Sequence, residues 1–175
     1  MRCPRCGAAL APWGYGRRRQ VRGAHGARLS VRPRRARCSK CATTHVLLAD
    51  SLWPRRADTA EVIGTALELS ALGMGHRKIA ARLGRAEGTV RGWIRRFARR
   101  AKAIHRFFSL VVAVRTGVPA HWDTGNSPDL DAVLAVVAAY LAAVRQGGAA
   151  GASSWWRFAG RVTGGRLLAC AASKS

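Results

Sequence analysis

Acidic residues are scarce in this chain, whose 175 residues include 8 Asp and Glu against 31 Lys and Arg, a formal net charge of +23 at pH 7. This imbalance excludes a surface on which the two signs cancel, and like charges repel one another in a compact state. We therefore expect a polyanionic partner, with nucleic acid as the first candidate and an anionic membrane surface as the second. The hydrophobic fraction of 49% excludes a disordered basic tail and predicts a packed core.

Lysine is scarce as well, since 27 of the 31 basic residues are Arg. Codons rich in G and C favour Arg, and that bias accounts for much of the preference over Lys, but it does not account for the lack of acids. The surplus is uneven, with a net charge of +12 in residues 1–58, +6 in 59–100 and +5 in 101–175. The first third of the chain therefore carries about half of the charge.

Long hydrophobic runs are missing. A membrane-spanning helix needs about 20 apolar residues, whereas the longest uncharged apolar run, Ala132–Val144, has thirteen. Residues 1–6 do not show the apolar core of a signal peptide either. We expect a cytoplasmic, nucleoid-associated protein without a membrane partner. Its thiols should stay reduced, so its five cysteines are metal ligands or free thiols.

Four of the five cysteines form two pairs, Cys3 with Cys6 and Cys38 with Cys41, each with a two-residue gap. Such a gap lets one tight turn present two thiolates to one ion, and four thiolates fill a closed, tetrahedral structural Zn²⁺ site. Gly7 follows the first pair, where the turn favours a residue that tolerates a positive φ. The spacing predicts one structural zinc ion per chain.

The 31 residues between the two pairs can hold a β-hairpin. Its arms are expected at 14–21 and 27–37 with a turn at 23–26, and the β-branched and apolar run 43–48 predicts a third strand. A ribbon of this kind has almost no apolar core of its own, so we expect its metal to fold it.

The cysteines and histidines also admit other roles. A redox Cys-x-x-Cys motif needs a βαβ context, which this sequence does not show. His25 and His45 are alternative ligands; otherwise they are a turn residue and a strand or phosphate-contact residue. Cys170 is isolated in the sequence, and we expect it to be a small buried side chain.

Three short helices are predicted in the middle of the chain. The first runs from Asp58 to about Leu72 and begins with the spacing of a capping box, with Asp58 as N-cap and Glu61 as its partner. A second helix fits residues 76–83, and a third fits residues 87 to about 100. Glycines separate the three segments, as is common where helices end.

The third of these helices has two contrasting faces. Its apolar stripe is Val90, Trp93, Ile94 and Phe97, and the opposite face is Gly88, Arg91, Gly92, Arg95, Arg96 and Arg99. Arg on a helix in the major groove can pair bidentately with guanine. The two glycines suit something that approaches the backbone closely, or they reflect composition bias. The alternative is a plain helical bundle with a solvated basic face.

The order of these segments resembles the N-terminal DNA-binding part of bacterial insertion-sequence transposases. The residues that carry the resemblance are the paired cysteines, then HRKIAARLG at 76–84 and TVRGWIRR at 89–96. The chain is also similar to small actinobacterial helix-turn-helix proteins. The resemblance covers roughly residues 1–101 and implies a homeodomain-like fold for the helical part.

By position, the resemblance implies that the recognition helix starts at residues 86–89 and that Arg91 and Arg95 read bases. Arg85 departs from the pattern, because helix-turn-helix motifs usually have an apolar residue there. The expected DNA contacts are Arg77, Lys78, Arg82, Glu87, Thr89, Arg91, Arg95, Arg96 and Arg99, with secondary phosphate contacts at Arg17, Arg18, Arg19, Arg34 and Arg35.

The last third lacks the parts of a catalytic domain. Transposases of that kind continue into a domain with three carboxylates that bind two metal ions, whereas the final 74 residues hold only Asp123, Asp129 and Asp131. The latter two stand at a helix start with Ser127 as N-cap, where the helix dipole explains them. No nucleotide-binding loop or nucleophile motif is found elsewhere. We expect no enzyme and infer no small-molecule substrate.

Apolar helices are predicted at residues 103–114 and 128–145. We expect a helical hairpin that packs on the central helices or serves as a dimerisation element, and in the second case the partner is a second copy of the chain. Residues 147–153 predict a linker. Ser154 is the expected N-cap of a short helix at 155–163, whose first two residues, both Trp, anchor into the core or a partner.

Together these features predict a mainly α protein with a small β zinc ribbon, a homeodomain-like helix-turn-helix bundle and a C-terminal helical segment. The expected units are the ribbon at 1–57, the helix-turn-helix at 58–101, a helical hairpin at 102–146, and a linker with a short helix at 147–175. The expected function is sequence-specific binding of double-stranded DNA, as a transcriptional regulator or a transposase-derived protein without a catalytic domain. A protein-interaction module and an RNA-binding ribbon are the alternatives.

Overall fold

The computed structural model describes residues 1–119, 127–147 and 154–169. Over these residues the protein has six α-helices and a small antiparallel β-structure, so it is mainly α with a small β part, as the sequence predicts. Asp123, Cys170 and most of the predicted linker lie outside the described residues.

Residues 10–47 form an extended β structure that we call the β arm. It consists of a long, interrupted hairpin and one further strand. Its pairs, all antiparallel, are β1 (Leu10–Tyr15) with β4 (Arg34–Cys38), β4 with β5 (Thr44–Leu47), and β2 (Arg19–Arg22) with β3 (Arg28–Val31). The pairing register shifts between Pro12 and Tyr15, where Gly14 has a φ of +69°. The two unbroken arms that the sequence predicts are wrong. Pro33 interrupts the ladder because it has no N–H to donate, and its carbonyl accepts the Gly16 N–H at 2.7 Å.

The six helices begin and end within two residues of the predicted bounds. They are α1 (Ala60–Ala71), α2 (His76–Leu83), α3 (Glu87–Ala98), α4 (Ala101–Thr116), α5 (Pro128–Arg145) and α6 (Trp155–Val162). The predicted N-caps of the last two are confirmed: Ser127 Oγ accepts the Leu130 N–H at 3.1 Å, and Ser154 Oγ accepts the Arg157 N–H at 3.3 Å.

The capping box predicted for α1 is wrong. Thr59 is the N-cap, and no side chain caps the helix there. The Asp58 carboxylate instead accepts hydrogen bonds from Arg22 at 2.7 Å and Arg85 at 2.6 Å. A buried carboxylate costs less free energy with two charge-assisted partners than with one backbone N–H, so the long-range partners replace the local one.

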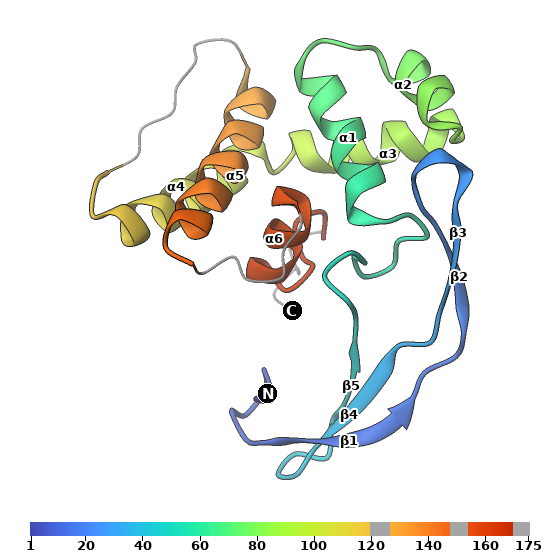
Figure 1. The fold of residues 1–175 in the computed structure, drawn as a ribbon, viewed down its shortest axis with the longest axis vertical. Helices are drawn as coiled ribbons and strands as arrows, with labels where there is room; N and C mark the ends of the chain where they lie inside the picture. The colour runs from blue at the N-terminus through green and yellow to red at the C-terminus, as the bar shows by residue number, and fades with distance from the viewer. Residues whose placement is uncertain (120–126, 148–153, 170–175) are drawn as a thin grey trace.

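The β arm touches the helices at one end only (Figure 1). Its tip, closed by a short 3₁₀ turn at Ala24–Gly26, lies beside α2 and α3, and the end formed by β1, β4 and β5 lies farthest from them. Backbone bonds join the tip to the entry of α1, since the Arg22 N–H donates to Ala57 O at 2.7 Å and the Thr59 N–H donates to Arg22 O at 3.1 Å. The arm is therefore fixed to the helices through its tip.

Trp156 of α6 stands at the centre of the hydrophobic core. Its ring makes edge contacts with the rings of Trp53 and Phe97, at centroid distances of 6.2 and 6.3 Å. The indole N–H groups of Trp155 and Trp156 both donate to Glu68 of α1, at 2.7 and 2.6 Å. The Trp pair therefore anchors α6 to the core of its own chain.

Gly64 of α1 has no room for a side chain, because a Cβ there would lie 2.0 Å from the Trp156 ring. We expect Gly64→Ala to lower the free energy of unfolding by about 2–3 kcal/mol, in spite of the better helix propensity of Ala, since overpacking displaces the indole. Chemical unfolding measures the difference. Gly88→Ala is the matched control, because its Cβ would meet no atom within 4 Å. Equal stability of the two variants would contradict this packing.

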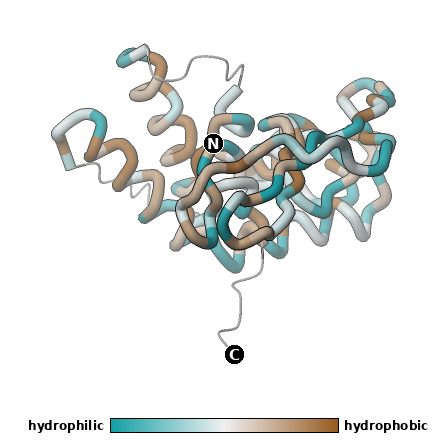
Figure 2. Tube along the Cα trace, turned by 90° about the horizontal axis from the view of Figure 1, so that it is seen from below, coloured by the Kyte–Doolittle hydropathy of each residue, from teal (hydrophilic) through white to brown (hydrophobic). Residues whose placement is uncertain are grey.

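The helical hairpin of α4 and α5 lies on the side of the helices away from the β arm (Figure 1). α5 packs on α1, α3 and α6, yet both helices carry hydrophobic stretches along their length (Figure 2). The larger exposed apolar residues of the pair are Phe107, Leu110, Val114, Leu134, Leu141 and Val144. The use of this hairpin as a dimerisation element, one of the two roles that the sequence admits, stays a prediction. Among the described helices, none is long and apolar enough to cross a membrane.

Candidate metal centre and nucleic-acid surface

The four paired cysteines meet at the end of the β arm that is far from the helices. Their Sγ atoms all lie within 4.8 Å of one another, with 3.8 Å between Cys3 and Cys41 and 3.4 Å between Cys6 and Cys38. Four thiolates around one ion, with metal–sulfur bonds of about 2.3 Å, stand about 3.8 Å apart in a tetrahedron. The residues present therefore fit a single tetrahedral metal ion.

Two backbone turns hold these sulfurs in place. The Gly7 N–H donates to Cys3 O at 2.8 Å, and Gly7 has the positive φ that the sequence predicts, +73°. Ala42 takes the matching place after the second pair with a φ of +56°, a conformation that costs a non-glycine residue about 1–2 kcal/mol. The Lys40 and Cys41 N–H groups donate to Cys38 Sγ at 3.4 Å each.

Hydrogen bonds shift the pKa values of the cysteine thiols in different directions. The side chain and backbone of Thr43 lower the pKa of Cys41 to about 6, and the Cys41 N–H lowers the pKa of Cys38. A backbone hydrogen bond from Ala8 lowers the pKa of Cys6, but the other cysteine side chains outweigh it and raise the pKa to about 11. A bound cation favours the thiolate form of every cysteine that it contacts.

His45 lies beside the cysteine cluster, with its Nε2 3.4 Å from Cys3 Sγ. From β5 it can donate a hydrogen bond to that sulfur, as residues around metal ligands commonly do. His25 lies in the turn at the arm's other end, with a φ of +52°. Among the described residues, the ligand atoms that all lie within 4.8 Å of one another belong to the four cysteines, and neither histidine is part of this group.

The face of α3 that carries Arg and Gly is directed to solvent, as the helical wheel predicts. The residues Val90, Trp93 and Phe97 are buried and Ile94 is half-buried, whereas Gly88, Arg91, Arg95, Arg96 and Arg99 are exposed and Gly92 and Thr89 are half-buried. The helix therefore presents four guanidinium groups to an external ligand.

α2 adds three exposed cations, Arg77, Lys78 and Arg82. Arg77 Nε lies 3.6 Å from a Glu87 carboxylate oxygen at the start of α3, with 81% of the Arg77 side chain and 60% of the Glu87 side chain exposed. Such an exposed pair contributes little to stability and opens easily. The predicted contacts of α2 and the start of α3 thus lie together at one end of the helices.

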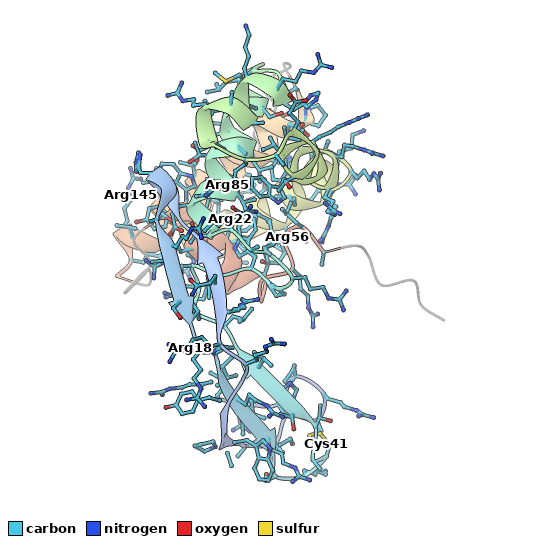
Figure 3. All side chains as sticks on the ribbon, turned by 90° about the vertical axis from the view of Figure 1, so that its right-hand side faces the viewer. Arg18, Arg22, Cys41, Arg56, Arg85 and Arg145 are labelled. Carbon is cyan, nitrogen blue, oxygen red and sulfur yellow. The ribbon has the colours of Figure 1, made fainter. Side chains whose placement is uncertain are left out.

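The arginines predicted to hold phosphates from the β arm are spread along it. Arg17, Arg18 and Arg34 are exposed, and Arg19 and Arg35 are half-buried. Figure 3 shows Arg18 between the end of the arm that carries Cys41 and the end that carries Arg22. The arm therefore offers a row of cations instead of one cluster.

Sequence reasoning missed two exposed aromatic rings on this arm. Trp13 and Tyr15 are about half exposed, and the guanidinium groups of Arg37 and Arg32 lie over their rings, at 4.7 and 5.2 Å from the centroids. The sequence signal that could have indicated these rings is the alternation of aromatic and other residues along a strand that has almost no core to bury them.

Sequence reasoning also missed an ionic cluster, which we call the tip junction and which consists of Asp58, Arg22 and Arg85. The side chains of Asp58 and Arg85 are 2% and 6% exposed. Arg85 also donates to Gly23 O in the arm tip at 2.7 Å and to Leu83 O at 2.9 Å. Figure 3 shows Arg22 and Arg85 near each other where the arm meets the helices. Arg85 therefore joins the turn before α3 to the tip of the arm.

A family model with the description Domain of unknown function (DUF6431) matches residues 3–93. No curated protein and no solved structure matches the chain. The matched range begins at Cys3 and ends at Trp93, so it holds the four cysteines, the β arm, the tip junction, α1, α2 and the first half of α3. The resemblance to transposases stays a prediction.

Proposed function

This chain belongs to the DUF6431 family, and we propose that it is a zinc-stabilised protein that binds double-stranded DNA sequence-specifically through a helix-turn-helix formed by α1, α2 and α3. The observation that carries the proposal is the division of α3 into a buried apolar stripe and an exposed face of four arginines. Arg on a helix that enters the major groove can pair bidentately with guanine O6 and N7.

The packing of the three helices supports this proposal. α1, α2 and α3 contact one another pairwise, and the turn between α2 and α3 passes through Gly84, whose φ is +60°. Ile79 and Ala80 of α2 are fully buried, so the two helices approach each other closely. This arrangement is compatible with a homeodomain-like bundle whose third helix reads the major groove.

Zinc is the metal that we propose for the four-cysteine centre. Zn²⁺ in structural sites is almost always tetrahedral, with four cysteines as one of its usual donor sets, and the donor set here consists of four cysteines. A closed site leaves no position for a substrate, so the ion would fold the end of the arm instead of performing chemistry. The arm would then present its arginines to phosphates, which supply affinity without sequence information.

The double variant Arg91→Ala, Arg95→Ala tests the proposed recognition face. We expect the preference of the variant for a selected duplex over a scrambled one to fall by about 5- to 150-fold per arginine, because each bidentate contact to a base contributes about 1–3 kcal/mol of discrimination. Fluorescence anisotropy with both duplexes measures the loss.

Arg18→Ala is the matched control, since Arg18 lies on the arm and not on α3. We expect this variant to weaken binding to both duplexes equally and to reduce the dependence of log affinity on log salt by about 1. Equal affinity of the wild-type protein for all duplexes and for single strands would contradict sequence-specific binding.

An RNA-binding role of the β arm is the second candidate. The exposed rings of Trp13 and Tyr15, each beneath a guanidinium group, are the observation that favours it. Unpaired bases stack on aromatic rings of this kind. The same titration with a single-stranded RNA separates the two candidates, since duplex DNA does not offer unstacked bases.

A further inference from the structure

A groove of about 390 Å³ runs along one flank of α3, between that helix and the connector that leads into α1. We call it the arginine groove. The residues that define it are Arg22, Arg55 and Arg56 on one wall and Gly88, Gly92 and Arg96 of α3 on the other. We propose that the arginine groove binds a backbone phosphate of the DNA duplex. The inference rests on the proposed function and adds Arg22, Arg55 and Arg56 to the contacts that the sequence predicts.

The charge of the groove favours an anion. Four guanidinium groups line it, whereas the carboxylate among its lining residues, Asp58, is only 2% exposed and already accepts hydrogen bonds from Arg22 and Arg85. The Arg22 side chain remains 46% exposed beside this pair. A phosphate diester carries one negative charge, and guanidinium groups bind it with short, charge-assisted hydrogen bonds.

Two glycines of α3 lie in the wall of the groove. Gly88 and Gly92 lie one helical turn apart on α3, so they share a flank of the helix. A Cβ at Gly92 would lie 2.9 Å from the Arg96 guanidinium, which crosses Gly92 and donates to its carbonyl at 2.9 Å. A Cβ at Gly88 would meet no atom within 4 Å. The Arg96 guanidinium is the far end of a flexible, exposed side chain and can move away, so packing within the chain requires glycine at neither position.

An external ligand that approaches the backbone explains the glycine at position 88. Glycine in a helix is unfavourable relative to alanine, and its exposed position in α3 gives no compensating contact within the chain. A phosphate held by the arginines over this position would need the space that a methyl group would fill. Arg55, on the opposite wall of the groove, has a φ of +59°, an uncommon conformation for a non-glycine residue.

The groove also divides the arginines of α3 by role. On the helical wheel, Arg96 lies on the flank of the groove, and Arg91 lies on the opposite side of Arg95. A duplex with one phosphate in the groove would therefore direct Arg91 and Arg95 to base edges, and Arg96 would contact the backbone. Arg55, Arg56 and Arg22 would fix the register of the helix on the duplex.

Phosphate-by-phosphate neutralisation tests this inference. The zinc-loaded full chain is titrated with duplexes in which single phosphates are replaced in turn by neutral methylphosphonates. We expect wild-type affinity to fall about tenfold when the phosphate held in the groove is neutralised, besides the losses at phosphates that α2 and the arm contact. The Arg55→Ala variant should bind the unmodified duplex about tenfold more weakly than the wild type does. Its affinity should not fall further when that phosphate is neutral. Arg77→Ala, on α2, is the control and should keep the wild-type sensitivity to it.

Gly88→Ala gives an independent readout. We expect this variant to have a higher melting temperature than the wild type and a several-fold weaker affinity for the duplex, a combination that a purely structural glycine does not produce. Undiminished affinity of Gly88→Ala, or an Arg55→Ala variant that keeps full sensitivity to every methylphosphonate, overturns the groove alone. A wild-type protein that binds no duplex overturns the proposed function and this inference with it.

Discussion

Asp58→Ala is expected to lower the free energy of unfolding by about 3–5 kcal/mol, because it leaves the Arg85 guanidinium buried without its counter-charge. The side chains of Asp58 and Arg85 are almost fully buried, and Arg22 is the second partner of the carboxylate. Urea unfolding at neutral pH, followed by far-UV circular dichroism, measures the change. The tip of the β arm should also detach, since Arg85 binds Gly23 in that tip.

Asp50→Ala is the matched control for this prediction. Asp50 likewise accepts hydrogen bonds from two arginines, Arg157 and Arg161 of α6, but those side chains are 29% and 43% exposed. We expect a loss of about 1 kcal/mol or less. A loss at Asp58 as small as the loss at Asp50 would contradict the structural role of the tip junction.

The pH dependence of the Asp50 contacts has a definite sign. Burial raises the pKa of Asp50, but hydrogen bonds from Arg161 and Arg157 outweigh it and hold the pKa below its ordinary value. A depressed carboxyl pKa stabilises the fold above the unfolded pKa of about 3.9, and this contribution disappears as the pH falls through the folded value. The hydrogen bonds from Arg157 and Arg161 of α6 to Asp50 should therefore persist between neutral pH and mildly acidic pH.

Removal of the metal is expected to unfold the cysteine end of the β arm and leave the helices folded. The sheet of β1, β4 and β5 buries little besides Cys3, Ala36 and Cys38, whereas the helices have their own core around Trp156. Without the ion, this sheet lacks the apolar area that a small module needs. Chelation of zinc-loaded protein should therefore change the fluorescence of Trp13 and the circular dichroism signal of the strands. The circular dichroism signal of the helices should persist.

Zinc analysis and thiol titration complete this prediction. We expect one zinc ion per chain in the wild type and none in Cys38→Ser. The His45→Gln variant should retain one zinc ion but bind it about 10–100-fold more weakly, because His45 would hydrogen-bond to a metal ligand without binding the metal itself. Purified protein that holds no zinc and whose four paired cysteines stay freely reactive would contradict the proposed metal centre.

Much of the fold could be predicted from the sequence because its signals are local. The cysteine pairs, the apolar stripe of α3 and the N-caps Ser127 and Ser154 each depend on residues a few positions apart, and a spacing rule describes each of them. The same rules explain why α1 to α6 lie close to their predicted bounds.

The tip junction could not be predicted, because its partners are distant in the sequence. Asp58 stands three residues before Glu61, so local spacing indicates a cap, but Arg22 lies 36 residues away and Arg85 lies 27 residues away. Hydrogen bonds from two arginines to a buried carboxylate outweigh the local alternative. The arginine groove arises in the same way, since Arg22, the connector and α3 meet only in the folded chain.

The proposal that the exposed arginines of α3 read DNA sequence is tested most directly by selection from a random duplex library. The zinc-loaded full chain is incubated with the library at a salt concentration near physiological, and the bound duplexes are sequenced over successive rounds. We predict one enriched motif that contains guanines, and we predict that the Arg91→Ala, Arg95→Ala variant does not enrich it. Bound duplexes with no enriched motif would contradict sequence-specific recognition by α3.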